Sequence, residues 1–276
     1  MAANQIAAVQ IARDTEVRQS LNGVRFATFG ETGLAALDLD RMLEAVPAAI
    51  VAALEANTYY FVPAALREDA ARTPVMVATA WSDELSDTAI CHRNVELGSG
   101  RHGVFISARL LNDRFALSFE FFINVAHAFT DKVGVPAAFA DLVWKQATDN
   151  VRGEASLDAW ESRNLAFGRP INYSPDEPAP RRTRAFAQSA RVLNAEAARP
   201  NAIDEKERTH YLGAAFTDAI AIYLLSLAMD FNYSDLRERD YPLLAPVALA
   251  ARLRLIAELF PPNPNYEFAV KYRRRA

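Results

Sequence analysis

The chain has 276 residues, of which 51% are hydrophobic, 10% aromatic and 23% charged, the composition of an ordinary folded protein. A chain of this length buries roughly 70–75% of its unfolded surface, so its core requires neither disulfides nor a structural metal. The net charge of −4 gives no electrostatic reason to expect a nucleic-acid partner. Cys91 is the single cysteine, which excludes an intramolecular disulfide. Its neighbour His92 points to the opposite face of the strand predicted there, so we expect no nucleophile–base pair.

We expect a cytoplasmic protein that does not cross a membrane. Residues 1–13 show no basic region followed by an apolar run, so they do not resemble a signal peptide. The most hydrophobic stretch, residues 211–229, approaches the length of a membrane span. However, Asp218 interrupts it and no pair of cationic residues flanks it. We interpret this stretch as a buried central helix.

The first half of the chain is predicted to combine one helix with short strands. Apolar residues spaced by four predict a helix over residues 39–58, although Pro47 in its interior allows a kink or two shorter helices. Three β-rich runs follow at 74–81, 88–97 and 103–108, with turn residues between them. Runs this short and this close together favour an antiparallel meander over βαβ units.

The second half is predicted to be helical, from its hydrophobic periodicity and its capping residues. The expected helices cover residues 113–132, 136–150, 156–167, 204–229 and 245–260. Prolines end the last helix, and alternation over residues 266–272 predicts a final strand.

These elements predict an α+β protein that is mostly helical, with a small antiparallel sheet followed by long packed helices. Residues 1–168 are expected to hold the sheet and the first core helix. Residues 169–202 carry five prolines and form a long connection. Residues 203–276 supply C-terminal helices that pack on the same core, which gives one compact domain overall.

Four polar residues recur on one side of the otherwise apolar helix at 113–132. Glu120, Asn124, His127 and Asp131 follow one another at steps of four, three and four. At ~100° per residue, these steps place all four in a stripe roughly 60° wide. The stripe either lines a functional site or is the solvent-facing side of an amphipathic helix. A surface helix normally carries charges over a wider arc, so both interpretations stay open.

Part of this helix resembles the metal-binding helix of the zincin metallopeptidases. Residues 123–129, I-N-V-A-H-A-F, are similar to the H-E-x-x-H motif, which often continues as H-E-V-A-H-A-F. In that family the two histidines bind zinc and the glutamate polarises the attacking water. Here Ile123 stands at the first ligand position, Asn124 at the glutamate position, and only His127 keeps a ligand side chain.

A later segment resembles the helix that supplies the third zinc ligand, a glutamate, in the gluzincin branch of zincins. Residues 214–224, A-A-F-T-D-A-I-A-I-Y-L, match the apolar residues of the pattern E-x-F-A-E-A-F-A-L-Y-L. Ala214 occupies the ligand position and Asp218 the second acidic position. The strand predicted at 103–108 precedes the first helix, as the substrate-binding edge strand does in zincins. The resemblance covers these two segments and this strand only.

The resemblance implies a zincin-like fold without peptidase activity. A catalytic zinc typically takes three protein ligands and an open water position, which one imidazole cannot supply. Ile123 offers no lone pair, and the amide of Asn124 is not a base that accepts a proton from water. We therefore expect a non-catalytic zincin-like protein, a pseudo-peptidase without a cofactor, that retains either a cleft for a peptide or protein or only the scaffold.

Two other functions stay open. One is a metal-dependent hydrolase that holds zinc or another divalent metal with unconventional ligands between two long helices. The other is a protein-interaction module that uses an aromatic surface at residues 59–61 and Trp81. The two candidate histidines also have structural interpretations. His127 could be a core residue bonded to Glu120 or Asn124, and His210 could be an exposed residue. The candidate catalytic residues are His127, Asn124, Glu120 and Asp218, and the candidate metal ligands are His127, Asp131, His210 and Asp218.

Overall fold

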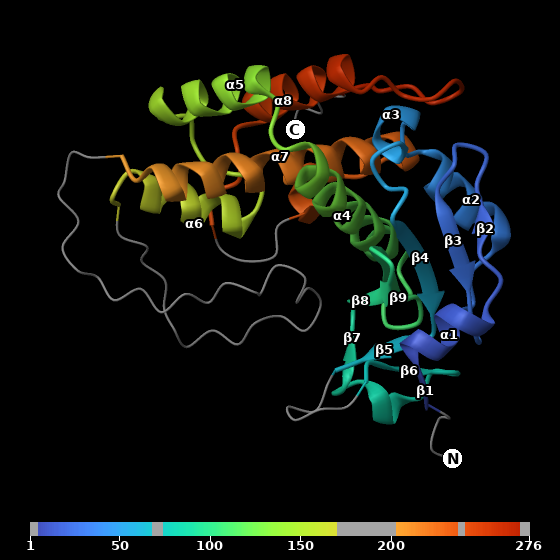
Figure 1. The fold of residues 1–276 in the computed structure, drawn as a ribbon. Coiled ribbons are helices and arrows are strands. Elements are labelled where there is room, and N and C mark those ends of the chain that lie inside the picture. The colour runs from blue at the N-terminus through green and yellow to red at the C-terminus, as the bar shows by residue number, and fades with distance from the viewer. Residues whose placement is uncertain (1–4, 68–73, 170–202, 237–240, 271–276) are drawn as a thin grey trace. The chain divides into compact units, whose positions relative to one another are not determined.

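The computed structural model describes residues 5–67, 74–169, 203–236 and 241–270. Within these residues the protein is of the α+β class and mostly helical, as predicted. By its internal contacts the chain divides into a first unit, residues 1–129 with 260–266, and a second unit, residues 130–259 with 267–276. The first unit contains both sheets, and the second is built of helices (Figure 1).

The larger sheet of the first unit has five strands and is mixed. In spatial order its strands are β2 (Arg18–Gln19), β3 (Arg25–Thr28), β4 (Asn57–Val62), β9 (Arg101–Ser107) and β8 (His92–Gly98). β3, β4 and β9 run parallel, whereas the outer strands β2 and β8 are antiparallel to their neighbours. Because β9 lies inside the sheet, the edge position expected for the strand at 103–108 belongs to β8 instead.

The crossover between the parallel strands β3 and β4 is the main departure from the predicted elements. It consists of α2 (Ala36–Glu44) and the short α3 (Ala48–Val51), which begins after Pro47. Proline starts a helix readily because its missing N–H has no intrahelical partner there. The helix predicted over residues 39–58 is therefore two helices, and its last residues belong to β4.

The smaller sheet is antiparallel throughout, but it is not the predicted meander. Its four strands are, in spatial order, β1 (Gln5–Ala7), β6 (Met76–Ala78), β5 (Ala64–Leu66) and β7 (Ala89–Ile90). The run at 88–97 forms two strands, since β7 joins this sheet and β8 joins the larger one. The predicted meander is reduced to the antiparallel β8–β9 hairpin. A 3-10 turn, η1 (Asp83–Leu85), lies between β6 and β7.

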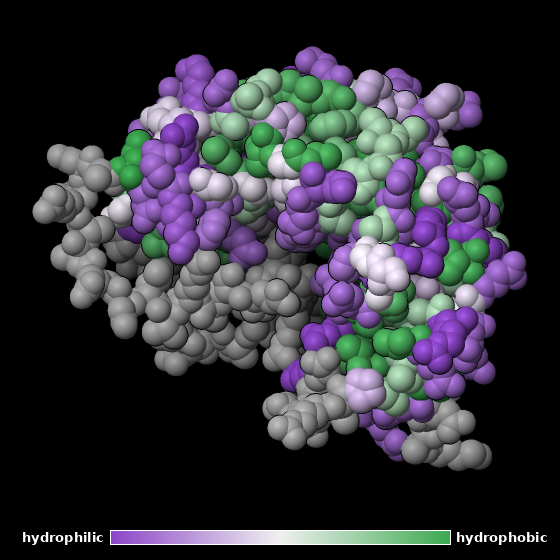
Figure 2. Space-filling view, viewed as in Figure 1, coloured by the Kyte–Doolittle hydropathy of each residue, from purple (hydrophilic) through white to green (hydrophobic). Residues whose placement is uncertain are grey.

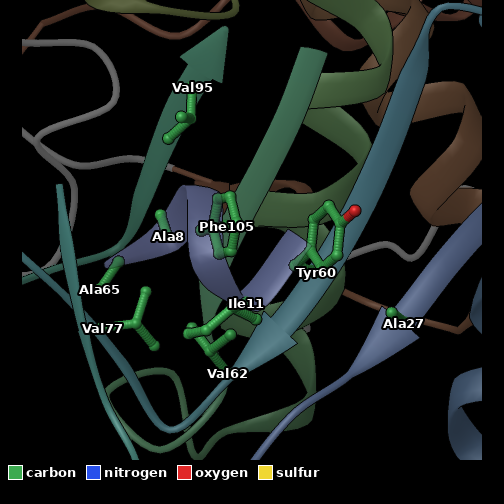
Figure 3. Packing of buried hydrophobic residues seen from close by; sticks show 9 residues of the cluster. All are labelled: Ala8, Ile11, Ala27, Tyr60, Val62, Ala65, Val77, Val95 and Phe105. Carbon is green, nitrogen blue, oxygen red and sulfur yellow. The ribbon is translucent and has the colours of Figure 1, made fainter. Parts of the chain in front are cut away.

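One face of the larger sheet packs against α1 (Ala8–Asp14) and the smaller sheet. Tyr60 and Phe105, from neighbouring strands, stack with their ring centroids 4.6 Å apart. Around them lies a buried cluster formed by Ala8, Ile11, Ala27, Tyr60, Val62, Ala65, Val77, Val95 and Phe105 (Figure 3). The aromatic run at 59–61 is at most 1% exposed, and Trp81 packs against a second buried cluster. These side chains therefore do not form the predicted aromatic surface.

The opposite face of the larger sheet carries α4 (Arg114–Val133), whose bounds match the predicted helix within one residue at each end. Side chains alternate along a strand, so Tyr59 and Phe61 of β4 face away from Tyr60. Phe121 of α4 packs edge-on against Tyr59, with ring centroids 5.0 Å apart, and lies 5.9 Å from Phe61. The helix ends before Gly134, which has a φ of 71°.

The second unit confirms the helices predicted after residue 134. Ser156 caps one of them by accepting a hydrogen bond from the N–H of Ala159, and Asp204 caps another by accepting from Lys206 and Glu207. α7 packs against the other three helices (Figure 1). The helices of the second unit are α5 (Ala137–Thr148), α6 (Leu157–Ala166), α7 (Glu205–Ala228) and α8 (Pro246–Leu259), and a short 3-10 helix, η3 (Tyr233–Leu236), precedes α8.

α7 is the one helix among the described residues with the length and hydropathy of a membrane span. However, 67% of its most apolar window is buried inside the structure, as in the predicted central helix of a soluble protein. Hydrophobic side chains also reach the visible surface over α5 and α8 (Figure 2). Val247 of α8 is 72% exposed.

Two predicted segments have a different outcome. Residues 266–270 form no strand, and the remainder of that predicted strand, at 271–272, lies outside the described residues. All but the first residue of the predicted connection at 169–202 also lies outside them.

Candidate functional site

The polar stripe of α4 divides into a buried half and an exposed half. Glu120 and Asn124 are 1% and 5% exposed, whereas His127 and Asp131 are exposed to solvent. Neither interpretation of the stripe therefore holds along its whole length. The prediction that His127 is a core histidine is wrong.

A histidine from the edge strand β8 completes the buried half of the stripe. The Nδ1 atom of His92 lies 2.5 Å from Oε1 of Glu120. The amide of Asn124 donates to the backbone carbonyl of Glu120 at 2.8 Å and lies 3.3 Å from the same Oε1 atom. The Glu120 side chain is 2% exposed and that of His92 is 20% exposed. The carboxylate is thus held from two sides, and the histidine ring reaches from it toward solvent.

The second ring nitrogen of His92 is available to a ligand. Nδ1 faces Glu120, so in the neutral ring the carboxylate favours the tautomer in which Nδ1 carries the proton and Nε2 is the acceptor. Among the described residues Nε2 has no hydrogen-bond partner, and it does not belong to the buried polar atoms that lack one. We conclude that Nε2 is accessible from outside.

The outer edge of β8 presents backbone donors and acceptors. The N–H of Ser107 donates to the carbonyl of Cys91 at 2.8 Å, which makes these opposed residues a hydrogen-bonded pair. Hydrogen-bonded and non-bonded pairs alternate along an antiparallel ladder. The backbone groups of His92, Asn94 and Glu96 therefore point away from β9. No described strand pairs with this edge of the sheet.

The positions that match the zincin motif do not form a zinc site. Ile123 is 1% exposed and apolar, and the Asn124 amide already donates to Glu120. Throughout the part of the chain that the structure describes, no group of three or more His, Cys, Asp or Glu side chains is arranged to hold a metal ion. Cys91 is buried and, as expected, is not paired with His92, whose partner is Glu120.

The remaining sequence-predicted residues lie in the second unit. His210 is exposed and lies 3.8 Å from Glu207 of the same helix, which agrees with its structural interpretation. Asp218 is 5% exposed and accepts a 2.6 Å hydrogen bond from the hydroxyl of Ser156. Thr217, beside it, donates to Thr130 in the last turn of α4 at 3.0 Å. His127 belongs to the first unit and Asp218 to the second.

Burial is the main cause of the raised pKa of Asp218. It raises the pKa of this carboxyl to about 8, against the opposing effect of the Ser156 hydrogen bond. The nearby Asp158 is also partly buried, which raises its pKa to about 6. At neutral pH Asp218 is therefore mainly protonated, in contrast to a metal-ligating carboxylate.

Sequence reasoning missed a buried ionic network centred on Glu154, which is 0% exposed. Its Oε1 accepts from Arg163 at 3.1 Å and from the Tyr211 hydroxyl at 2.6 Å, and its Oε2 accepts from Arg252 at 2.9 Å. Nε of Arg252 also donates to Gln146 at 2.7 Å. Arg252 gave a signal, because it interrupts the apolar face of α8 and a charge there needs a buried partner.

Comparison of this chain with known protein families, with curated proteins and with solved structures finds no match. The functional argument therefore rests on the residues and on the geometry of the site.

Replacing Glu154 with glutamine is expected to destabilise the protein by about 3–5 kcal/mol, because two buried guanidinium groups lose their counter-charge. Denaturant-induced unfolding measures this loss. Glu258→Gln, on an exposed position of α8, is the matched control and is expected to change the unfolding free energy by less than about 0.5 kcal/mol. Equal effects of the two substitutions contradict the assignment of Glu154 as the centre of the network.

Replacing Asp218 with asparagine is expected to change how stability depends on pH. Between about pH 4 and pH 8 the folded state keeps a proton on Asp218 that the unfolded chain releases. The contribution of this carboxyl to the unfolding free energy is therefore complete below pH 4 and is lost as the pH rises to about 8. The unfolding free energy of the wild type relative to Asp218→Asn should fall by roughly 1 kcal/mol per pH unit across that window. Unfolding curves at several pH values test it, with exposed Asp141→Asn as the control. A constant difference across the window rules out the raised pKa.

Proposed function

We propose that this protein is a non-catalytic relative of the zincin peptidases that binds an extended peptide along the outer edge of β8. The observation that carries the proposal is the pairing of this edge strand with α4, made through His92 and Glu120. In zincins the substrate-binding edge strand and the metal-binding helix serve one site. Here the strand and helix are adjacent, but the helix lacks the residues for catalysis.

The backbone of β8 provides the binding energy in this proposal. An extended peptide adds to an open sheet edge through main-chain hydrogen bonds, and side-chain contacts on alternate residues give specificity. The backbone N–H and C=O groups of His92, Asn94 and Glu96 point outward, so every second residue of this part of β8 is available for such pairing. Asn94 and Glu96 are exposed, so no described side chain blocks this part of the edge.

The chemistry of the α4 motif argues against hydrolysis. A peptidase needs a group that activates water, and Asn124 cannot accept its proton. Its amide is also engaged inside the helix, where it donates to the carbonyl four residues earlier. Because Asn124 and Ile123 are buried, neither is positioned to contact a bound peptide directly.

Metal analysis separates this proposal from the alternative of a metal-dependent hydrolase. The purified protein, dialysed against zinc and then against metal-free buffer, is expected to retain far less than one zinc per chain, since a lone imidazole binds zinc weakly. Elemental analysis measures the ratio. One stoichiometric zinc that disappears in His127→Ala, without loss of thermal stability, would support the hydrolase instead.

Peptide binding tests the edge strand directly. Selection from a display library of short random peptides should enrich sequences that bind the full chain, and fluorescence anisotropy gives their affinities. Asn94→Pro removes an outward N–H without touching the β8–β9 ladder, so binding should weaken at least about tenfold, as expected for a lost hydrogen bond together with a steric conflict.

Asn94→Ala is the matched control for this substitution, because it removes the same side chain and keeps the N–H. It should bind within about threefold of the wild type. Melting curves confirm that both variants are folded. Equal binding by the proline and alanine variants shows that peptides use another surface and refutes the proposal.

A further inference from the structure

We propose that His92, held in place by Glu120, selects a lysine or arginine side chain of the bound peptide. This inference rests on the proposed function and adds to it the class of peptide that β8 recognises. It assigns His92 as a specificity-determining residue, a role that the sequence did not suggest.

The register of strand pairing brings a peptide side chain to this histidine. Residues directly opposite each other on neighbouring antiparallel strands have Cβ atoms about 4.5–5.5 Å apart and point to the same face. On β8 that face is the one that carries α4, because His92 reaches Glu120 there. The peptide residue opposite His92 therefore projects beside the imidazole ring, within reach of Nε2.

The chemistry of the pair favours a cationic donor. With Nδ1 directed at the Glu120 carboxylate, the neutral imidazole offers the lone pair of Nε2 to a donor. An ammonium or guanidinium group donates to this acceptor while lying near the buried charge of Glu120. Hydrogen bonds that involve an ionised partner are about twice as strong as neutral ones.

Charges nearby on this face agree with a basic ligand. Glu96 lies four residues after His92, so its side chain points to the same face of β8. It is exposed, and His102 lies opposite it on β9. Arg93 lies between them on the other face of the strand, so its charge is directed away from the ligand position. The charged groups that the strand directs toward the ligand are thus the carboxylate of Glu96 and the His92–Glu120 pair.

A buried carboxylate that only stabilises the fold does not require this arrangement. The Glu120 carboxylate already receives a hydrogen bond from the Asn124 amide, and the second ring nitrogen of His92 remains outside. A hydrogen bond from His92 to Glu120 does not depend on Nε2 lying at an unpaired strand edge. The combination of a fixed tautomer with an open backbone edge points to recognition.

The test is a double-substitution cycle with the full chain and the peptides enriched on it. Each peptide is synthesised with its lysine or arginine and with norleucine in that place, and affinities are measured by fluorescence anisotropy. Norleucine is expected to weaken binding to the wild type about five- to tenfold. Binding to His92→Gln should be nearly insensitive to the exchange, whereas the control His102→Gln should retain the full loss.

The outcomes separate the two proposals. If the norleucine exchange costs the same in His92→Gln as in the wild type, His92 does not select the cation and this inference fails. Asn94→Pro still reports on binding along β8 in that case, so the proposed function survives. If enriched peptides carry no cationic residue, the inference also fails. If no peptide binds the chain at all, the proposed function fails and the inference with it.

Discussion

The contact of Phe121 with the aromatic side chains of β4 decides which residues of α4 can reach the edge of the sheet. Phe121 is completely buried between the helix and the sheet. Burial of one such ring stabilises the fold by about 1.5–3 kcal/mol. This gain helps to offset the cost of the buried hydroxyl of Tyr59, which has no hydrogen-bond partner among the described residues. With Phe121 facing β4, the preceding Glu120 is rotated about 100° around the helix axis. It meets His92 of β8, and Asn124 follows one turn later.

This geometry gives a packing role to the residues that stand at the positions of the zincin motif. The register that places a first histidine and a glutamate in a zincin here holds Ile123, which joins the apolar core, and Asn124, which bonds within its own helix. Both side chains stabilise the packing of α4 and offer nothing to a water molecule. The histidine that does face the edge strand comes from β8, not from the motif.

Regular helices were predictable from sequence, and the connections between strands were not. The start of α7 follows from its cap Asp204 and the end of α4 from Gly134, and both are local signals. Residues 59–61 carry no strand signal in the sequence, because a fully buried parallel strand lacks the alternation that marks a half-buried one. The burial of Glu120 was also hidden, since its partner His92 is 28 residues away and periodicity reports only one helix at a time.

The network in the second unit shows a different use of charge. Glu154 bonds directly to Arg163 of α6, Tyr211 of α7 and Arg252 of α8. Arg252 extends the network to α5 through Gln146, so the network connects all four helices. One carboxylate between two guanidinium groups leaves a net positive charge. An ionised Asp218 would balance it, and Arg252 does favour that form. Burial opposes ionisation more strongly, and the pKa rises to about 8. Desolvation therefore outweighs Coulombic attraction at this position, as it does for many buried ion pairs. Apolar residues of similar volume would pack as tightly, but they would not fix which helix faces which. We infer that the network serves to specify the arrangement of the helices more than to add stability.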